Sequence, residues 1–381
     1  MIYLDNAASS WPKPPGVISR MRELLQNNTA NPGRAAHQLA LAAGKIILGA
    51  RERLAALFNI QDPDRIVFYL NATQALNQAI KGSLQPGDHV VTSSLEHNSV
   101  MRPLAAMQRQ GVEVTVVPAD RSGRLNPSLV KKAIRPSTKM MIMVHASNVM
   151  GTILPIEELG WLAHKEGLIF LVDASQTAGV LPIDVQQMHI DLLAFPGHKG
   201  LLGPQGTGGL YIAPHLELTT LIEGGTGSQG HLLEQPASLP YRYESGTPNT
   251  VGLAGLEAAV EFIQATGLEK IRRHEQNLTD LVLAGLKEIE GVTLYGPGKS
   301  SMQVGVVSFN LSGQDPGEVG YLLDQIYHIA VRTGLHCAPS AHRTLGTLGR
   351  GTVRASFSCF TTEEEVVFFL KAVREIRNQS G

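Results

Sequence analysis

A single lysine, Lys199, follows an apolar, strand-like run and lies among glycines in the stretch LLAFPGHKGLLGPQGTGG. The acidic or basic residues nearest to it along the chain are Asp191 and Glu217, so it does not belong to a charged, solvent-facing surface. Desolvation lowers the pKa of an amine toward the deprotonated, nucleophilic form. We therefore predict that Lys199 does chemistry through its amine.

Other polar residues recur where strand-like runs end, at positions 71–73, 96–98, 148, 173–176 and 198–199. In open α/β sheets, ligands bind beyond the carboxyl ends of the strands, so these positions predict one shared site. Asp173 ends an apolar run, where a partly desolvated carboxylate needs a cation or N–H donors. Thr73 and Ala72 open a helical pattern whose backbone N–H groups could hold an anion such as phosphate.

Each of these residues also has a simpler explanation when it is taken alone. Thr73 could be a helix N-cap, His97 could be a histidine of the core or rim, and Asn148 could be an ordinary turn residue. The argument for a site therefore depends on the number of polar groups that the predicted sheet would bring to one rim.

The combination of residues fits pyridoxal 5′-phosphate. Lys199 would form the Schiff base, Asp173 would contact the pyridinium nitrogen, and Thr73 would bind the phosphate. His97 would stack on the ring, and the flanking glycines would let the backbone approach the phosphate.

The elements that would position these residues alternate in type. From about residue 65, apolar runs such as RIVFYL, KMMIMVHAS and GLIFLVDAS alternate with helical patterns. Such alternation predicts a mainly parallel sheet covered on both faces. Two long helical stretches after residue 249 precede a β, α, β, β, α pattern. We expect a large domain over residues 15–250 and a small α+β domain formed by residues 1–14 and 251–381.

The composition limits the function classes. The 381 residues include 32 Lys and Arg and 33 Asp and Glu, and this balance gives no basic excess for nucleic acid or an anionic membrane. Apolar runs are too short for a membrane span, and no signal peptide is visible, so we expect a cytoplasmic location. Two cysteines without a CxxC pair predict neither a disulfide framework nor a metal site.

Cys337 lies in a polar stretch, AVRTGLHCAPSAH, after a short strand-like run. Its loop position, close in sequence to Arg332 and His336, favours a partly exposed thiol that can ionise. A buried structural cysteine is the simpler alternative, and a metal site with His336 and His342 would lack a fourth ligand. We expect Cys359, inside RASFSCF, to lie in the core.

A series of short motifs extends from one end of the chain to the other: YLDNAAS at residues 3–9, then NATQALN, EHNSV, HASNVMGT, VDASQ, GHK, SGTPN, RTGLHCA and RASF. Their joint presence and order resemble the class V aminotransferase branch of the fold-type I pyridoxal phosphate enzymes. Within that branch, they resemble the group II, SUF-type cysteine desulfurases, a family that includes selenocysteine lyases. The resemblance implies a large α/β domain with a mainly parallel mixed sheet and a smaller C-terminal α+β domain.

The same resemblance implies roles for individual residues. Lys199, Cys337 and His97 would be catalytic, with Cys337 taking sulfur from L-cysteine as a persulfide and leaving L-alanine. The substrate would be bound by Asn148, Arg332 and Arg354, because a guanidinium binds a carboxylate bidentately. The cofactor would be bound by Ala72, Thr73, His97, Asn148, Asp173, Gln176, His198, Lys199 and Thr247.

The resemblance also implies partners. Thr247 would come from the partner subunit of a homodimer, and a sulfur-acceptor protein, as in iron–sulfur cluster assembly, would take up the persulfide sulfur. One residue departs from the family pattern: Pro196 stands where a serine often contacts the phosphate, so one phosphate bond is lost or replaced.

Several functions remain open from the sequence. They are a selenocysteine lyase, a cysteine sulfinate desulfinase, another class V aminotransferase-like enzyme and a non-catalytic partner in sulfur trafficking. Cys337 argues against a plain aminotransferase, which needs no thiol. The joint presence of Lys199, Asp173, His97, Arg354 and Cys337 argues against a non-catalytic partner. Nothing in the sequence separates L-cysteine from L-selenocysteine as substrate.

Overall fold

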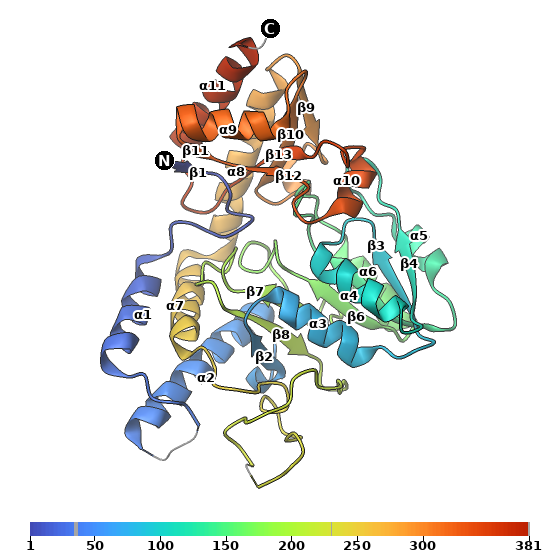
Figure 1. Cartoon of the computed structure of the whole chain (residues 1–381), viewed down its shortest axis with the longest axis vertical. Coiled ribbons are helices and arrows are strands. Elements are labelled where there is room, and N and C mark those ends of the chain that lie inside the picture. Colours follow the sequence, from blue (N-terminus) through green and yellow to red (C-terminus); the bar gives the residue numbers. More distant parts are fainter. Residues whose placement is uncertain (34–36, 230, 380–381) are drawn as a thin grey trace.

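The computed structural model describes residues 1–33, 37–229 and 231–379. Its centre is a seven-stranded sheet with the strand order β2-β8-β7-β6-β5-β3-β4 (Figure 1). The strands are β2 (Ile66–Tyr69), β3 (His89–Ser93), β4 (Glu113–Val117), β5 (Thr138–Val144), β6 (Ile169–Asp173), β7 (Leu192–Pro196) and β8 (Gly208–Ile212).

Five of these strands, β4, β3, β5, β6 and β7, run parallel to one another, whereas β8 is antiparallel to both β7 and β2. Every residue of β3, β6, β7 and β8 is buried, because helices cover both faces of the sheet. The predicted mainly parallel mixed sheet is confirmed.

The two faces of the sheet are covered by different helices. Alternate strand residues point to opposite faces, so Leu192 and Ala194 of β7 pack with α3 (Ala72–Ser83) and α4 (Asn98–Gln108). Leu193 and Phe195 pack into a second core on the other face. The helices that contribute to that core include α2 (Gln38–Phe58), α6 (Ile156–Lys165) and α7 (Thr250–Thr266). Two further helices are α1 (Pro15–Asn27) and α5 (Pro127–Ala133).

A smaller, four-stranded antiparallel sheet has the order β12-β13-β10-β9. Its strands are β9 (Val292–Tyr295), β10 (Val306–Leu311), β12 (Arg332–Gly334) and β13 (Thr352–Ser356). A third core joins this sheet to α8 (Leu268–Lys287), α9 (Pro316–Tyr327) and α11 (Glu363–Gln379). The N-terminal strand β1 (Ile2–Tyr3) pairs in parallel with β11 (Ile329–Ala330), so the chain begins beside this smaller part. Short helices complete the chain: η1 (Pro63–Arg65), η2 (Ser300–Met302) and α10 (Pro339–Leu345).

The junction between the two parts lies near the helices α7 and α8, which meet at 81°. The first packs against α1 and α2, and the second packs against α11 and the small sheet. The domain limits at residues 14 and 250 stay a prediction. No single helix of the described residues is long and apolar enough to cross a membrane, and only the bent pair α7–α8 meets the length and composition criteria together.

Candidate active site

Lys199 lies in a tight loop directly after the carboxyl end of β7. The backbone N–H of Gly197 donates to the Thr207 carbonyl at 2.8 Å, and the N–H of Leu202 donates to the Lys199 carbonyl at 2.8 Å. Gly200 is required for close packing, since a Cβ there would lie 2.6 Å from the Ala178 carbonyl oxygen. These glycines let neighbouring backbone approach the lysine and enclose it.

Burial lowers the pKa of Lys199 to about 8. The carboxylate of Asp173 opposes this shift, and the guanidinium groups of Arg354 and Arg332 add to it. The amine is therefore closer to its nucleophilic form at neutral pH than an exposed lysine would be.

Asp173 is the last residue of β6, the strand next to β7, and only 2% of it is exposed. Its Oδ1 accepts hydrogen bonds from the N–H and the hydroxyl of Ser175. The other oxygen has no hydrogen bond from the described residues, so this buried carboxylate has a lone pair to offer a ligand N–H.

Two helices begin side by side at the same rim. His97 is the N-cap of α4 and its Nδ1 accepts from the Ser99 N–H at 3.0 Å. The N-cap of α3 is Asn71, so the simpler explanation of Thr73 as an N-cap is wrong. Thr73 and Ser99 hold their hydroxyl oxygens 2.7 Å apart. Two helix N-termini with adjoining hydroxyls form a good environment for a phosphate group.

The imidazole of His97 is largely enclosed, and burial lowers its pKa to about 4. Asp173 opposes this shift, and the positive charges of Lys199, Arg332 and Arg102 reinforce it. The ring is therefore neutral at neutral pH, which suits stacking on a planar ligand.

The buried polar atoms at this rim that have no hydrogen-bond partner among the described residues include Nδ1 of His198 and Oδ1 of Asn148. Such atoms cost free energy unless a ligand or water satisfies them. Burial also lowers the pKa of His198 to about 4, and the charges of Lys199 and Lys13 add to the effect. Gln176 lies close by and donates from Nε2 to the Ala7 carbonyl at 3.2 Å.

Arg354 lies on β13 of the small sheet and is 1% exposed. Its Nη2 pairs with Oδ1 of Asp5 at 2.7 Å, and its Nη1 donates to the Asn148 carbonyl at 3.0 Å. Its Nε has no partner among the described residues. Sequence reasoning missed Asp5, although this residue lies inside the YLDNAAS motif.

Cys337 lies between β12 and α10 and is exposed. Its φ of 57° and the φ of 48° at His336 are left-handed, a conformation that non-glycine residues rarely adopt. Two hydrogen bonds hold this segment against the part of the chain that carries the seven-stranded sheet. The Asn98 N–H donates to the Cys337 carbonyl at 2.8 Å, and the Asn148 Nδ2 donates to the His336 carbonyl at 2.7 Å. The thiol is therefore brought to the rim that carries His97 and Asn148.

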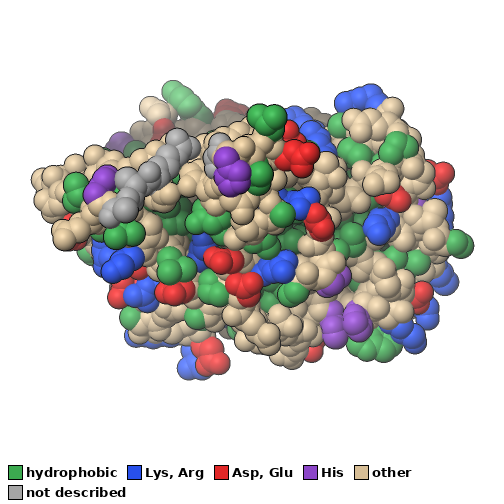
Figure 2. All heavy atoms as spheres, turned by 90° about the horizontal axis from the view of Figure 1, so that it is seen from below, with side chains coloured by type: hydrophobic (Ala, Val, Ile, Leu, Met, Phe, Trp, Pro, Cys, Tyr) green, Lys and Arg blue, Asp and Glu red, His purple; other side chains and the backbone are tan. Residues whose placement is uncertain are grey.

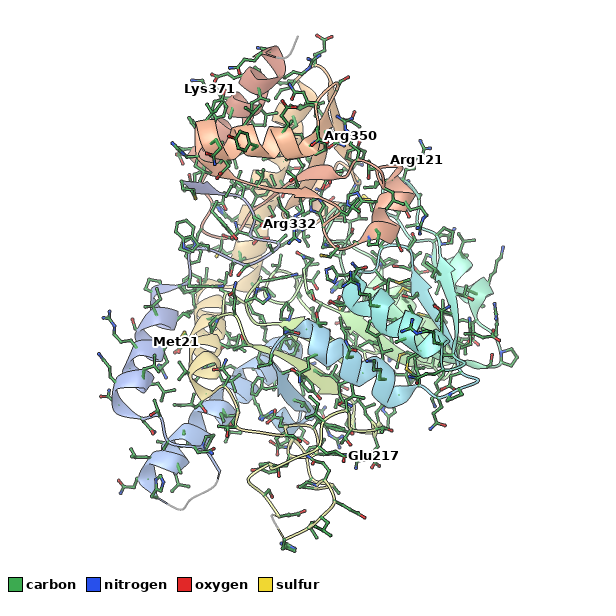
Figure 3. The ribbon with its side chains drawn as sticks, viewed as in Figure 1. Met21, Arg121, Glu217, Arg332, Arg350 and Lys371 are labelled. Atoms are coloured by element: carbon green, nitrogen blue, oxygen red, sulfur yellow. The ribbon has the colours of Figure 1, made fainter. Side chains whose placement is uncertain are left out.

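Arg332 approaches the same thiol, with Nη2 3.8 Å from the Cys337 Sγ. Figure 3 shows Arg332 between the small sheet and the helices below it. The guanidinium of Arg332 is therefore the charged group that contacts this sulfur. The second cysteine differs, since Cys359 is partly buried and burial, followed by the charge of Glu275, raises its pKa to about 12.

The structure does not bring every predicted residue together. Thr247 is exposed and lines a separate cavity of about 600 Å³, formed by α2, the end of β2 and residues 240–249. Lys199 and Gln176 line a smaller cavity of about 30 Å³. The described residues contain no group of three or more His, Cys, Asp or Glu side chains that could hold a metal ion.

Ser99 and Ser10 were also missed by sequence reasoning. Ser99 could have been noticed because it follows the His97 N-cap by two positions, where capping contacts are common. No sequence signal marks Ser10, whose hydroxyl contacts the carbonyl of His198 at 3.1 Å from a distant part of the chain.

Comparison with known proteins places this chain in the aminotransferase class-V family. The family model described as aminotransferase class-V matches residues 2–369. A probable cysteine desulfurase of Methanothermobacter thermautotrophicus is 37% identical over 98% of this chain and 94% of its own length. A cysteine desulfurase of Escherichia coli is 34% identical over 100% of this chain and 94% of its own length.

Solved structures of cysteine desulfurases have the same fold. The apo structure of the enzyme from Thermococcus onnurineus superposes with a TM-score of 0.94 at 36% identity, covering 99% of this chain and 95% of that one. The cysteine desulfurase CsdA of Escherichia coli superposes with a TM-score of 0.88 at 29% identity, covering 100% and 95% of the two chains.

Proposed function

We propose that this chain, which belongs to the aminotransferase class-V family, is a pyridoxal 5′-phosphate-dependent cysteine desulfurase that converts L-cysteine to L-alanine. One observation carries the proposal: an exposed thiol, Cys337, docks at the same rim as a lysine whose pKa burial has lowered. An aminotransferase needs the lysine but has no use for the thiol.

The residues present fit the cofactor. The unpartnered Nδ1 of His198 and the free oxygen of Asp173 are polar groups that a ligand would satisfy. Lys199 would hold the cofactor covalently, Asp173 its ring nitrogen and Gln176 its ring oxygen. The ring would lie on His97, and the phosphate would be bound by Ala72, Thr73 and His198, with the Ser99 hydroxyl beside them. When bound, pyridoxal phosphate supplies an aldehyde and an electron sink.

The chain's own residues would then perform the remaining steps. Arg354 binds the substrate carboxylate with guanidinium N–H groups that Asp5 leaves free. Asn148, whose carbonyl accepts from Arg354, and Arg332, whose charge acts on Arg354, would bind the substrate beside it. The amine of Lys199 takes the proton from the substrate Cα. The Cys337 thiolate attacks the substrate sulfur, so a sulfur–sulfur bond forms as the Cβ–S bond breaks. The electron pair of the broken bond stays with the carbon fragment. This fragment takes up one proton at Cβ, regains one at Cα from the Lys199 ammonium and leaves as alanine.

The proposal includes a homodimer in which Thr247 of the partner subunit contacts the cofactor phosphate. Thr247 faces a cavity other than the one lined by Lys199, which supports a role across an interface. Large apolar side chains are exposed around that cavity: Leu48, Leu70, Leu221, Ile222 and Tyr241. Figure 2 views the molecule from the end that carries α2 and shows apolar side chains among charged ones.

Further partners remain part of the same proposal. The Cys337 persulfide would pass its sulfur to an acceptor protein, as in iron–sulfur cluster assembly. L-selenocysteine is an alternative substrate, and the expected cytoplasmic location stays a prediction.

The test is to incubate the purified, cofactor-loaded protein with L-cysteine and a reductant and to quantify alanine. Cys337→Ala is assayed in parallel, and a second series replaces L-cysteine with L-selenocysteine. Alanine from the wild type alone, with a persulfide mapped to Cys337, supports the proposal. Cofactor-loaded wild type that releases alanine only from L-selenocysteine would instead assign a selenocysteine lyase.

A further inference from the structure

The carbonyl oxygen of His198 receives an unusual number of donors. The backbone N–H of Ser10 donates to it at 2.9 Å, the Ser10 hydroxyl at 3.1 Å and the Lys13 ammonium at 3.1 Å. The hydroxyl of Ser9 lies 3.4 Å away. A carbonyl has two lone pairs, so this one is saturated by a single segment of the chain. It belongs to the peptide bond that directly precedes Lys199.

These donors lie on an N-terminal segment, residues 4–13, that also contacts other parts of the site. Asp5 pairs with Arg354, and the Ala7 carbonyl accepts from Gln176. Figure 1 shows the segment passing from the small sheet toward α1. It therefore contacts the substrate and cofactor residues as well as the lysine loop.

The side chain of Lys13 is half-buried, and burial lowers its pKa to about 8. No carboxylate of the described residues pairs with it; its Nζ donates to the Ser10 hydroxyl at 2.7 Å and to the His198 carbonyl. Burying an amine without an ion pair costs free energy. Both hydrogen bonds that the Lys13 ammonium donates go to the His198 carbonyl and to the Ser10 hydroxyl beside it. We therefore look for the role of Lys13 at the His198 carbonyl.

The role of Lys13 follows from the Lys199 loop that it contacts. Gly197 and Gly200 flank Lys199 closely, and a glycine has no side chain that restricts its own backbone, so contacts from neighbouring segments have to hold this loop in place. The amine stands at the end of a long side chain, so a shift of its backbone displaces the reacting atom. Displacements of about 1 Å are enough to slow an enzyme substantially.

We propose that Lys13, together with Ser10, is a positioning residue for Lys199, holding the peptide carbonyl from which the reactive lysine projects. This inference rests on the proposed reaction of Lys199 with the cofactor aldehyde. Lys13 itself touches neither substrate nor cofactor in this assignment.

The test compares Lys13→Met, which keeps the aliphatic chain, with Lys13→Arg, which keeps a positive donor. Lys131→Met is the matched control, because Lys131 is exposed on α5. Each cofactor-free protein is mixed with pyridoxal phosphate, and the borohydride-reducible adduct at Lys199 is quantified over time. The thermal unfolding midpoint of each cofactor-free protein is measured alongside.

We expect Lys13→Met to slow adduct formation by about tenfold, the loss of roughly one charge-assisted hydrogen bond. Lys13→Arg should restore most of the rate, and Lys131→Met should match the wild type. If Lys13→Met does not fold, Ser10→Ala provides the same comparison with a smaller change, because it removes only the hydroxyl.

The outcomes separate this inference from the proposed function. A wild type that forms no reducible adduct would overturn both. A wild type that forms the adduct while Lys13→Met reacts at the same rate would overturn only the positioning role. A slow Lys13→Met that also unfolds at lower temperature, and that Lys13→Arg does not rescue, would show a structural role and overturn the inference as well.

Discussion

The loop of Lys199 and the segment of Cys337 meet at one rim, yet the structure holds them in opposite ways. Glycine packing encloses the lysine loop, and its backbone is fixed by Thr207 on one side and by Ser10 on the other. The cysteine segment is held through its backbone carbonyls, while its thiol is exposed.

The difference follows from what each group has to do in the proposed reaction. A lysine that moves a proton needs a lowered pKa and a fixed position, and burial provides both. A thiol that receives sulfur and passes it to another molecule has to remain accessible. Because the backbone of Cys337 carries the docking contacts, its side chain stays free apart from the approach of Arg332.

The largest expected effect on activity comes from removing the buried amine of Lys199. Lys199→Ala should lower alanine formation by roughly 10²–10⁴-fold, the range for loss of a general base. It should also abolish the borohydride-reducible adduct, measured by mass spectrometry of the reduced protein. An unchanged adduct in this variant would show that another lysine holds the cofactor.

The two cysteines provide the next test, because one is exposed and the other is partly buried with a raised pKa. Cys337→Ala should reduce alanine formation to background and leave the cofactor bound. Cys359→Ala is the matched control and should keep the wild-type rate. Persulfide is measured by labelling and peptide mapping; persulfide on Cys359 would refute the assignment.

A smaller effect is expected at the carboxylate next to the lysine. Asp173→Asn keeps the volume and an oxygen that can accept from Ser175, but removes the negative charge. Loss of one charged hydrogen bond to a ligand corresponds to roughly tenfold to a hundredfold weaker binding. Cofactor retention during dialysis checks this, and retention equal to that of the wild type would rule out a contact with the cofactor ring.

Much of this site could be predicted from the sequence because its residues follow parallel strands. The carboxyl ends of such strands meet at one edge, so Asp173 and Lys199 had to lie close together once the strands were recognised. Contacts between distant segments carry no such local signal. The pairing of Asp5 with Arg354 and the contact of Ser10 with His198 depend on how the N-terminal segment passes the two sheets.

The docked conformation of Cys337 was equally invisible in the sequence. Left-handed backbone is usually marked by glycine or asparagine, and neither His336 nor Cys337 is of that type. The conformation is imposed by tertiary contacts from Asn98 and Asn148. Thr247 was predicted only through the resemblance, and its contact with the cofactor of a partner subunit stays a prediction.

The smallest effect expected from the contrast between the buried lysine and the exposed thiol is the pH dependence of adduct formation at Lys199. In the cofactor-free protein the Lys199 pKa is about 8, compared with an ordinary value of 10.5. The neutral amine is the reacting form, so the rate of adduct formation with pyridoxal phosphate should rise with pH and level off just above pH 8. A rate at Lys199 that keeps rising to pH 10 would contradict the lowered pKa.

The lowered pKa of Lys199 also determines how this residue's contribution to the free energy of unfolding changes with pH. Below pH 8, Lys199 is protonated in both the folded and the unfolded chain, and the cost of burying its charge is fully present. Between pH 8 and 10.5 the unfolded chain binds the proton that the folded chain has released, so this contribution to the free energy of unfolding increases with pH. Denaturant unfolding of Lys199→Met should show a smaller increase than the wild type, because Lys199 no longer contributes, whereas Lys13, whose pKa is also lowered to about 8, still does in this range. A wild-type pH dependence in this variant would show that Lys199 does not contribute. Cys337→Ala should keep the increase, because its exposed thiol takes no part in burying the lysine.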